Sequence, residues 1–94
     1  MSLTTALVSI DVEPDLISEA AEQIVDLKGV TEVYSVTGDW DLVVVVRVHN
    51  HDQLAEIIPN MINKIKGVRR TQTQLAFRTY SQHDLEQAFS IGTD

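Results

Sequence analysis

The stretch from residue 34 to residue 48, YSVTGDWDLVVVVRV, constrains the fold more than any other part of the chain. Residues 33–37 and 42–46 are both rich in β-branched and aromatic side chains, which favour strands. Between them, Gly38 and Asp39 suit a tight two-residue turn in which glycine takes a positive φ. The second segment is apolar at every position from 42 to 46, so both of its faces need cover. The stretch therefore predicts a β-hairpin whose second strand lies inside a layered domain.

Composition limits the classes of protein to which the chain can belong. Its 94 residues suffice for one domain with one core, and 44% of them are hydrophobic. It has no cysteine, and no apolar run reaches the length of a membrane span. The first residues form no basic targeting segment, so we expect a cytoplasmic protein without membrane contact. The net charge of −7 argues against direct binding of nucleic acid.

Four of the seven lysines and arginines gather in one short segment, as Lys64, Lys66, Arg69 and Arg70. The favoured interpretation places both lysines at the negative end of a helix and leaves both arginines in solvent. A phosphate site is the alternative interpretation of this basic cluster.

The first part of the chain carries one strand signal and one helix signal. Residues 5–12 alternate apolar and polar side chains, which predicts a strand with one buried face. Pro14 suits the start of a helix, and apolar residues then recur at helical spacing until Gly29 ends the pattern. The chain next enters the hairpin at Val30.

The second part repeats this order. Asn50 or Asp52 can cap a second helix, which Gly67 closes. Pro59 lies within the helical pattern, so we expect a bend or a delayed start of the helix there. A fourth strand is expected from about residue 69 to residue 80. A short final helix could follow, from Ser81 or His83 to Phe89.

A short internal repeat organises these elements. The segment LKGV at 27–30 recurs as IKGV at 65–68, an offset of 38 positions (67 minus 29). The resulting order is βαββαβ, which predicts a ferredoxin-like α+β fold with a four-stranded antiparallel sheet and two helices on one face. Leu7, Val43 and Val45 then lie on the open face, and such apolar faces mark interfaces. We expect an α/β-barrel-like homodimer that forms through the sheets.

Three segments are distinctive when taken in order: VTGDWDL at 36–42, IKGV at 65–68 and TQT at 71–73. Together they resemble the effector-binding domain of the Lrp/AsnC feast/famine regulators, which is known as the RAM domain. The resemblance covers roughly residues 4–80. We therefore assign residues 1–80 to this domain and residues 81–94, which depart from the family, to a C-terminal helix or tail.

The resemblance also implies a function. Family members take part in transcription regulation of amino-acid metabolism, and their effectors are amino acids or related small molecules. They usually carry a helix-turn-helix DNA-binding domain, but the first strand here begins close to Met1, so we expect a stand-alone domain. By the same resemblance, dimers assemble into rings such as octamers and ligands bind between neighbouring dimers. Full-length Lrp/AsnC-type regulators are then candidate partners.

Carried over position by position, the resemblance places the ligand at the hairpin tip and along the fourth strand. The residues so assigned are Thr37, Gly38, Asp39, Trp40, Asp41, Thr71, Gln72, Thr73 and Gln74. Elementary chemistry is compatible with this assignment. Asp39 or Asp41 can pair with an ammonium, while turn N–H groups and threonine hydroxyls can receive a carboxylate. Gln72 or Gln74 could read a polar side chain, and Trp40 could form the wall for an apolar one.

Each tip residue also has a structural interpretation. Gly38 serves the turn whatever the function, and Asp39 and Asp41 can cap the turn or lie in solvent. Trp40 can equally anchor an interface or the core. A ligand site within an oligomer interface would satisfy both interpretations.

Catalysis and metal binding find little support in the sequence. No further histidine lies near His49 and His51 in the sequence, so we assign no metal ligands. Neither a nucleophile elbow nor a phosphate-binding glycine loop is present, and we assign no catalytic residue and no cofactor. Two alternatives stay open. One is a small dimeric α+β-barrel enzyme of the monooxygenase or isomerase kind, and the other is a structural dimer without ligand.

Overall fold

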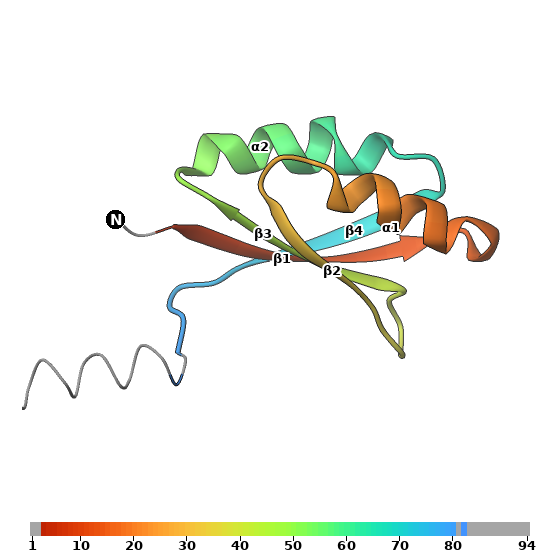
Figure 1. Cartoon of the computed structure of the whole chain (residues 1–94), viewed down its shortest axis with the longest axis horizontal. Coiled ribbons are helices and arrows are strands. Elements are labelled where there is room, and N and C mark those ends of the chain that lie inside the picture. The colour runs from red at the N-terminus through yellow and green to blue at the C-terminus, as the bar shows by residue number, and fades with distance from the viewer. Residues whose placement is uncertain (1–2, 81, 83–94) are drawn as a thin grey trace, which may run out of the picture.

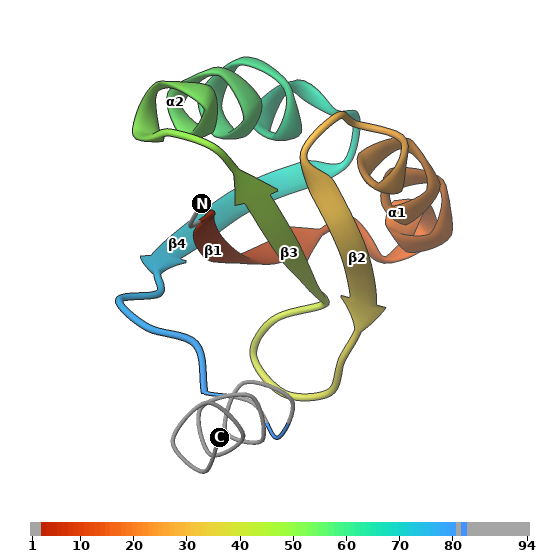
Figure 2. The same cartoon turned by 60° about the vertical axis from the view of Figure 1, so that its left-hand side comes forward.

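The computed structural model describes residues 3–80 and residue 82 of the chain (Figure 1). Within this part, the elements follow in the order β1–α1–β2–β3–α2–β4, with a 3₁₀ turn before α1 and another after α2. Their bounds are β1 Thr4–Val12, 3₁₀ Pro14–Leu16, α1 Ile17–Val25, β2 Val30–Ser35, β3 Leu42–Val48, α2 His51–Asn60, 3₁₀ Ile62–Lys64 and β4 Val68–Leu75. The sheet has the order β2-β3-β1-β4, and all neighbouring strands are antiparallel. Both helices cover the same face (Figure 2), so the predicted ferredoxin-like α+β fold is confirmed.

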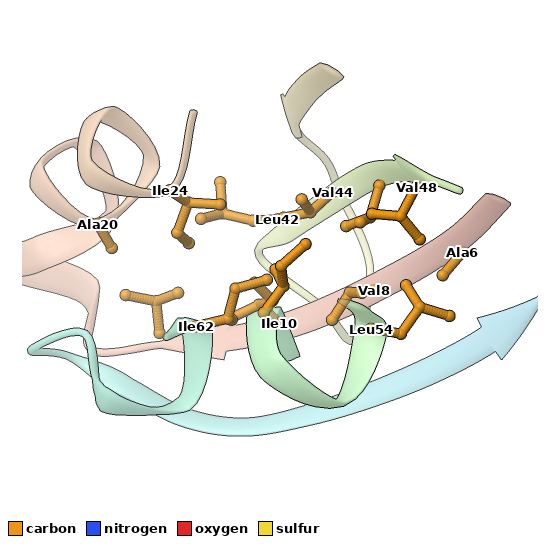
Figure 3. Packing of buried hydrophobic residues seen from close by; sticks show 13 residues of the cluster. Ala6, Val8, Ile10, Ala20, Ile24, Leu42, Val44, Val48, Leu54 and Ile62 are labelled. Carbon is orange, nitrogen blue, oxygen red and sulfur yellow. The ribbon is translucent and has the colours of Figure 1, made fainter. Parts of the chain in front are cut away.

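The core lies between this face of the sheet and the two helices (Figure 3). β3 is a central strand between β2 and β1, as its run of valines predicts. Alternate residues of β1 and β3 point toward the helices, and none of the side chains described as buried is polar or charged. The cluster consists of Ala6, Val8, Ile10, Val12, Ala20, Ile24, Leu42, Val44, Val46, Val48, Leu54, Ile57 and Ile62. Burial of each large member contributes about 1.5–3 kcal/mol to the stability of the sandwich.

The limits of α2 follow from its sequence. Asn50 Oδ1 accepts a hydrogen bond from the Gln53 N–H, and Gln53 Oε1 accepts one from the Asn50 N–H, each at 3.2 Å. This capping box satisfies two donors at once, so Asn50 is the cap and Asp52 lies in the first turn. The expected delayed start is wrong, because the helix begins directly after Asn50. Pro59 lies inside the helix, and the Met61 N–H still donates to the Ile57 carbonyl. The helix ends at Asn60 and a separate 3₁₀ turn follows, so the prediction that Gly67 closes it is wrong.

The two copies of the internal repeat have the same backbone. Gly29 has a φ of 97° and Gly67 a φ of 98°. After each glycine, the valine N–H donates to the carbonyl of the residue three positions before it, at 3.1 Å. A Cβ on Gly29 would lie 2.7 Å from Ile57, and one on Gly67 would lie 2.9 Å from Leu16. Both positions therefore require glycine, and each packs against the opposite half of the domain.

The hairpin connection is wider than predicted. β2 ends at Ser35 and β3 begins at Leu42, so the expected two-residue turn at Gly38 and Asp39 is wrong. The Val36 N–H donates to the Asp41 carbonyl at 3.0 Å and closes a loop over residues 37–40. The loop widens because Asp41 is bonded to β1 as well as to Val36.

The fourth strand is shorter than predicted. β4 ends at Leu75, whereas the sequence suggested an end near Tyr80. Its last pair joins Leu75 to Ala6, and one further bond runs from the Ala76 N–H to the Thr5 carbonyl. Because β1 begins at Thr4, β4 has no partner beyond this point. The predicted final helix, apart from residue 82, lies outside the described residues.

Candidate ligand-binding site

Asp41 is fixed to the end of β1 by two hydrogen bonds. Its N–H donates to the Ile10 carbonyl at 3.0 Å, and its Oδ2 accepts from the Val12 N–H at 2.8 Å. The last β1–β3 residue pair is Ile10 with Leu42, so the carboxylate continues the ladder beyond the end of β3. One oxygen of this half-buried carboxylate is therefore already used by the fold.

The neighbouring positions of the tip are open to solvent. Thr37, Gly38 and Asp39 are exposed. Gly38 has a φ of 107°, and a Cβ placed on it would meet no atom within 4 Å. The tip therefore presents the Asp39 carboxylate outward, whereas the Asp41 carboxylate points back to β1. The two acids, which the sequence could not distinguish, have different surroundings.

Trp40 is half-buried beneath an arginine. The Arg70 guanidinium carbon lies 4.4 Å from the centroid of the indole ring, in the geometry of a cation–π contact. Arg70 Nε also lies 3.4 Å from Asp11 Oδ2, and Arg69 Nη2 donates to Asp11 Oδ1 at 2.9 Å. The interpretation of both arginines as merely solvated is wrong, since they link the start of β4 to β1 and to the tip.

A β-bulge explains why both arginines reach one carboxylate. Asp11 pairs with Arg70 and Val12 pairs with Val68, which leaves Arg69 as the additional residue of β4. The hydrogen bond from Arg69 holds the pKa of the Asp11 carboxyl below its ordinary value of 3.8, and the positive charge of Arg69 adds to this effect. The same contact raises the pKa of Arg69. Asp11 is thus charged at neutral pH and fixes the arginine pair.

The predicted residues of β4 divide between the two faces of the sheet. Thr71 and Thr73 pair with Ile10 and Val8, which point toward the helices. Gln72 and Gln74 pair with Ser9 and Leu7 of the open face. Only one of these faces can contribute to a given pocket within one subunit.

Of the four predicted residues of β4, Thr71 is linked to the tip through β1, because it pairs with Ile10, whose carbonyl accepts from Asp41. Its hydroxyl donates to Asn63 Oδ1 at 3.1 Å. A cavity of about 230 Å³ lies at this position, lined by Asn63, Val68, Arg69, Arg70 and Thr71. The structure therefore brings Thr71 together with the two arginines, which the sequence did not assign to the site.

The open face of the sheet is mainly apolar at its centre. Leu7 is 37% exposed and Tyr34 is 48% exposed, and Val43 is half-buried between their strands. Of the two β4 sets considered, the glutamines Gln72 and Gln74 share this face. An exposed apolar surface on a domain of this size is typical of an interface.

The described residues offer neither a metal site nor a membrane-spanning helix. In that part of the chain, no three His, Asp or Glu side chains lie close enough to hold a metal ion, and His49 and His51 are both exposed. Neither described helix combines the length and apolar character needed to cross a membrane.

The architecture is that of the small ferredoxin-like α+β domains that leave one sheet face open. More specifically, the sequence profile of the Lrp/AsnC ligand-binding domain matches residues 5–85, so the chain belongs to the Lrp/AsnC family. An uncharacterised HTH-type transcriptional regulator of Pyrococcus furiosus is 39% identical over 82 residues, which cover 84% of this chain and 55% of that protein. The chain therefore spans about half the length of the curated relatives it matches.

Solved structures agree with this assignment. A protein of Thermus thermophilus superposes with a TM-score of 0.79 at 40% identity, and the match covers 84% of this chain and 99% of that one. AsnC of E. coli has the same fold, with a TM-score of 0.78 at 21% identity, over 84% of this chain and 54% of that one. The resemblance inferred from three short segments is confirmed.

Proposed function

We propose that this domain binds a small-molecule effector, specifically an amino acid, and passes its binding state to an oligomer in transcription regulation of amino-acid metabolism. The observation that carries the proposal is the hairpin tip, where an exposed Asp39 adjoins the Trp40 ring stacked on Arg70. Membership of a ligand-binding domain family supports it, as do relatives that are HTH-type transcriptional regulators. The role is non-catalytic.

The tip suits a zwitterion. Asp39 can pair with the ammonium group, and charge-assisted hydrogen bonds of this kind are the stronger ones. Asp41 contributes less, because Val12 already occupies one of its oxygens. The Thr37 hydroxyl and the backbone around Gly38 add polar contacts, and Trp40 forms an apolar wall.

A single subunit cannot enclose a ligand at this tip, since positions 37–39 are exposed. A neighbouring subunit would complete the site, which places the ligand between subunits. Gln72 and Gln74 then act from the open face rather than beside Thr71 and Thr73.

The open face supports a homodimer in which two sheets pack against each other. Leu7, Tyr34 and Val43 would form its apolar centre, and the glutamines of β4 would lie at one side. Such dimers would assemble into rings, for example octamers, in which the tips meet neighbouring dimers. Full-length regulators of the same family are the partners that could join such assemblies through the same faces.

An enzyme on this fold is the weaker alternative. A catalytic pocket between sheet and helices needs polar groups, yet every side chain described as buried there is apolar. Burial of an acid or base without partners would also be costly. A structural dimer without ligand remains the other alternative, and it differs from the proposal only in its response to effector.

The test is the mass of the protein in solution by light scattering, with and without a pooled amino-acid mixture. We expect an oligomer of dimers whose mass or stability changes with the mixture. Isothermal titration with the separate amino acids would then identify the ligand. An unchanged plain dimer, together with no heat of binding for any amino acid, would refute effector sensing and favour the structural dimer.

A further inference from the structure

We infer that Arg69 and Arg70 form the carboxylate-reading half of the tip site, a role that rests on the proposed effector binding and extends it. The bulge between β1 and β4 places the two residues side by side opposite Asp11. Bulges commonly re-aim side chains next to functional sites. Here the additional residue lets two guanidinium groups reach the same carboxylate, at 2.9 and 3.4 Å.

Asp11 uses only part of the hydrogen-bonding capacity of this arginine pair. Arg69 donates through Nη2 and Arg70 through Nε, and a guanidinium carries further N–H donors on its other nitrogens. Among the described residues, no acceptor bonds to the Nη groups of Arg70. The two side chains are 49% and 61% exposed, so part of each is open to solvent. Asp11 thus holds the pair in place and leaves the Nη donors of Arg70 for a second carboxylate.

Trp40 makes Arg70 a well-oriented donor. The guanidinium carbon of Arg70 lies over the indole ring, 4.4 Å from its centroid, and a guanidinium in such a contact can still donate hydrogen bonds in its own plane. A planar group that is already oriented loses less entropy when it binds a carboxylate bidentately. Lysine in the same position would keep the charge but lose this geometry.

A positive and a negative side chain both neighbour Trp40, the first in space and the second in sequence. A free amino acid has its carboxylate and ammonium on the same carbon atom, so a site that binds both groups needs a positive and a negative side chain close together. Arg70 is in contact with the indole ring and Asp39 precedes Trp40 in the chain. The tip therefore supplies both charges, whereas turn N–H groups and threonine hydroxyls alone would supply only neutral donors for the carboxylate.

The experiment is a titration followed by the fluorescence of Trp40, which is the only tryptophan of the chain and lies on Arg70. The full chain is titrated with the amino acids, with the 2-oxo acids that lack the ammonium, with the amines that lack the carboxylate, and with inorganic phosphate. The variants are Arg70→Gln, Arg70→Lys and Arg69→Gln. Lys28→Gln is the matched control, because it removes one exposed positive charge before β2, at the opposite end of that strand from the tip.

We expect Arg70→Gln to weaken binding of the amino acid and of its 2-oxo acid about ten- to hundredfold. Arg70→Lys should fall between this variant and the wild type, and Lys28→Gln should bind as the wild type does. Amines should bind weakly, and their affinity should be the same for the wild type and the Arg70 variants. Circular dichroism of each variant shows that the fold is kept.

Several results would overturn this role. Unchanged affinity in both glutamine variants would exclude the arginines, and the proposed function would stand without them. Equal affinity of wild type for amine and amino acid would show that the carboxylate is not read. Phosphate that competes at lower concentration than any carboxylate would reassign the pair to phosphate. Binding of 2-oxo acids but not of amino acids would refute the proposed function and leave the arginine role intact, whereas no binding of either refutes both.

Discussion

Replacement of Asp41 by alanine is expected to destabilise the domain, although the residue lies in a loop at the candidate ligand site. Asp41 Oδ2 accepts from the Val12 N–H at 2.8 Å, beyond the last pair of the β1–β3 ladder. Val12 is fully buried, so truncation of Asp41 leaves a buried donor without its charged acceptor. Such a loss costs about 1.5–3 kcal/mol.

The effect can be measured by thermal unfolding. For a domain of this size, each kcal/mol lowers the melting temperature by about 4–8 °C, so Asp41→Ala should melt about 6–24 °C below the wild type. Asp41→Asn keeps an oxygen acceptor in the same place and should lose less than half as much. All proteins are compared at equal protomer concentration, because association also stabilises the folded state.

Asp39→Ala is the matched control at the same tip. Its side chain is exposed, so its removal should change stability by no more than about 0.5 kcal/mol while it weakens binding of amino acids. Two results would refute the reasoning. One is an Asp41→Ala variant with the same melting temperature as the wild type. The other is an Asp39→Ala variant that is destabilised as strongly as Asp41→Ala.

Three further predictions concern the frame of the site. Gly67→Ala should destabilise the fold more than Gly38→Ala, since both have positive φ but only the Cβ at Gly67 meets Leu16, at 2.9 Å. We expect about 1–2 kcal/mol for Gly38→Ala from backbone conformation and about 1–3 kcal/mol more for Gly67→Ala, and equal losses in urea unfolding would contradict the steric argument. Because the folded pKa of Asp11 lies below 3.8, its contact with arginine stabilises the protein fully above pH 3.8 and is lost as the pH falls through the folded value. The stability of Asp11→Asn should therefore fall less than that of the wild type as the pH is lowered below 3.8, as followed by circular dichroism. An equal loss of stability in both proteins would disprove this. Asn50→Ala removes the cap of α2 and should cost about 0.5–2 kcal/mol, which denaturant unfolding can check against an exposed substitution elsewhere on the helix.

The sequence predicts the fold well because the fold depends on local patterns. The repeated glycine segments at 27–30 and 65–68 mark two equivalent helix ends, and both glycines have the positive φ that such ends require. The valine run identifies a central strand, which lies between β2 and β1, with the helices on one of its faces and the open face of the sheet on the other (Figure 2). Element order then selects one topology with few alternatives.

Local patterns do not fix the contacts that build the site. Arg69 and Arg70 are 58 and 59 positions from Asp11 in the sequence. Their contact with Asp11 depends on a β-bulge that no sequence pattern predicts. The width of the hairpin loop likewise depends on a bond between Asp41 and β1. A signal for the first contact did exist: Asp11 ends the open-face set of the first strand, and antiparallel pairing brings the start of the fourth strand beside it.

The strand pair β1–β4 lies on the open face and also contacts the tip through Arg70, so effector binding could act directly on assembly. Leu7, Ser9 and Asp11 follow one another on the open face of β1, and Gln74, Gln72 and Arg70 lie opposite them on β4. A ligand carboxylate that bonds to Arg70 therefore acts at the end of the ladder whose middle would form the dimer contact. Linkage then requires that dimerisation alter effector affinity by the same factor by which effector alters dimerisation. An effector affinity that does not change with protomer concentration, across the range in which dimers form, would show that the two events are independent.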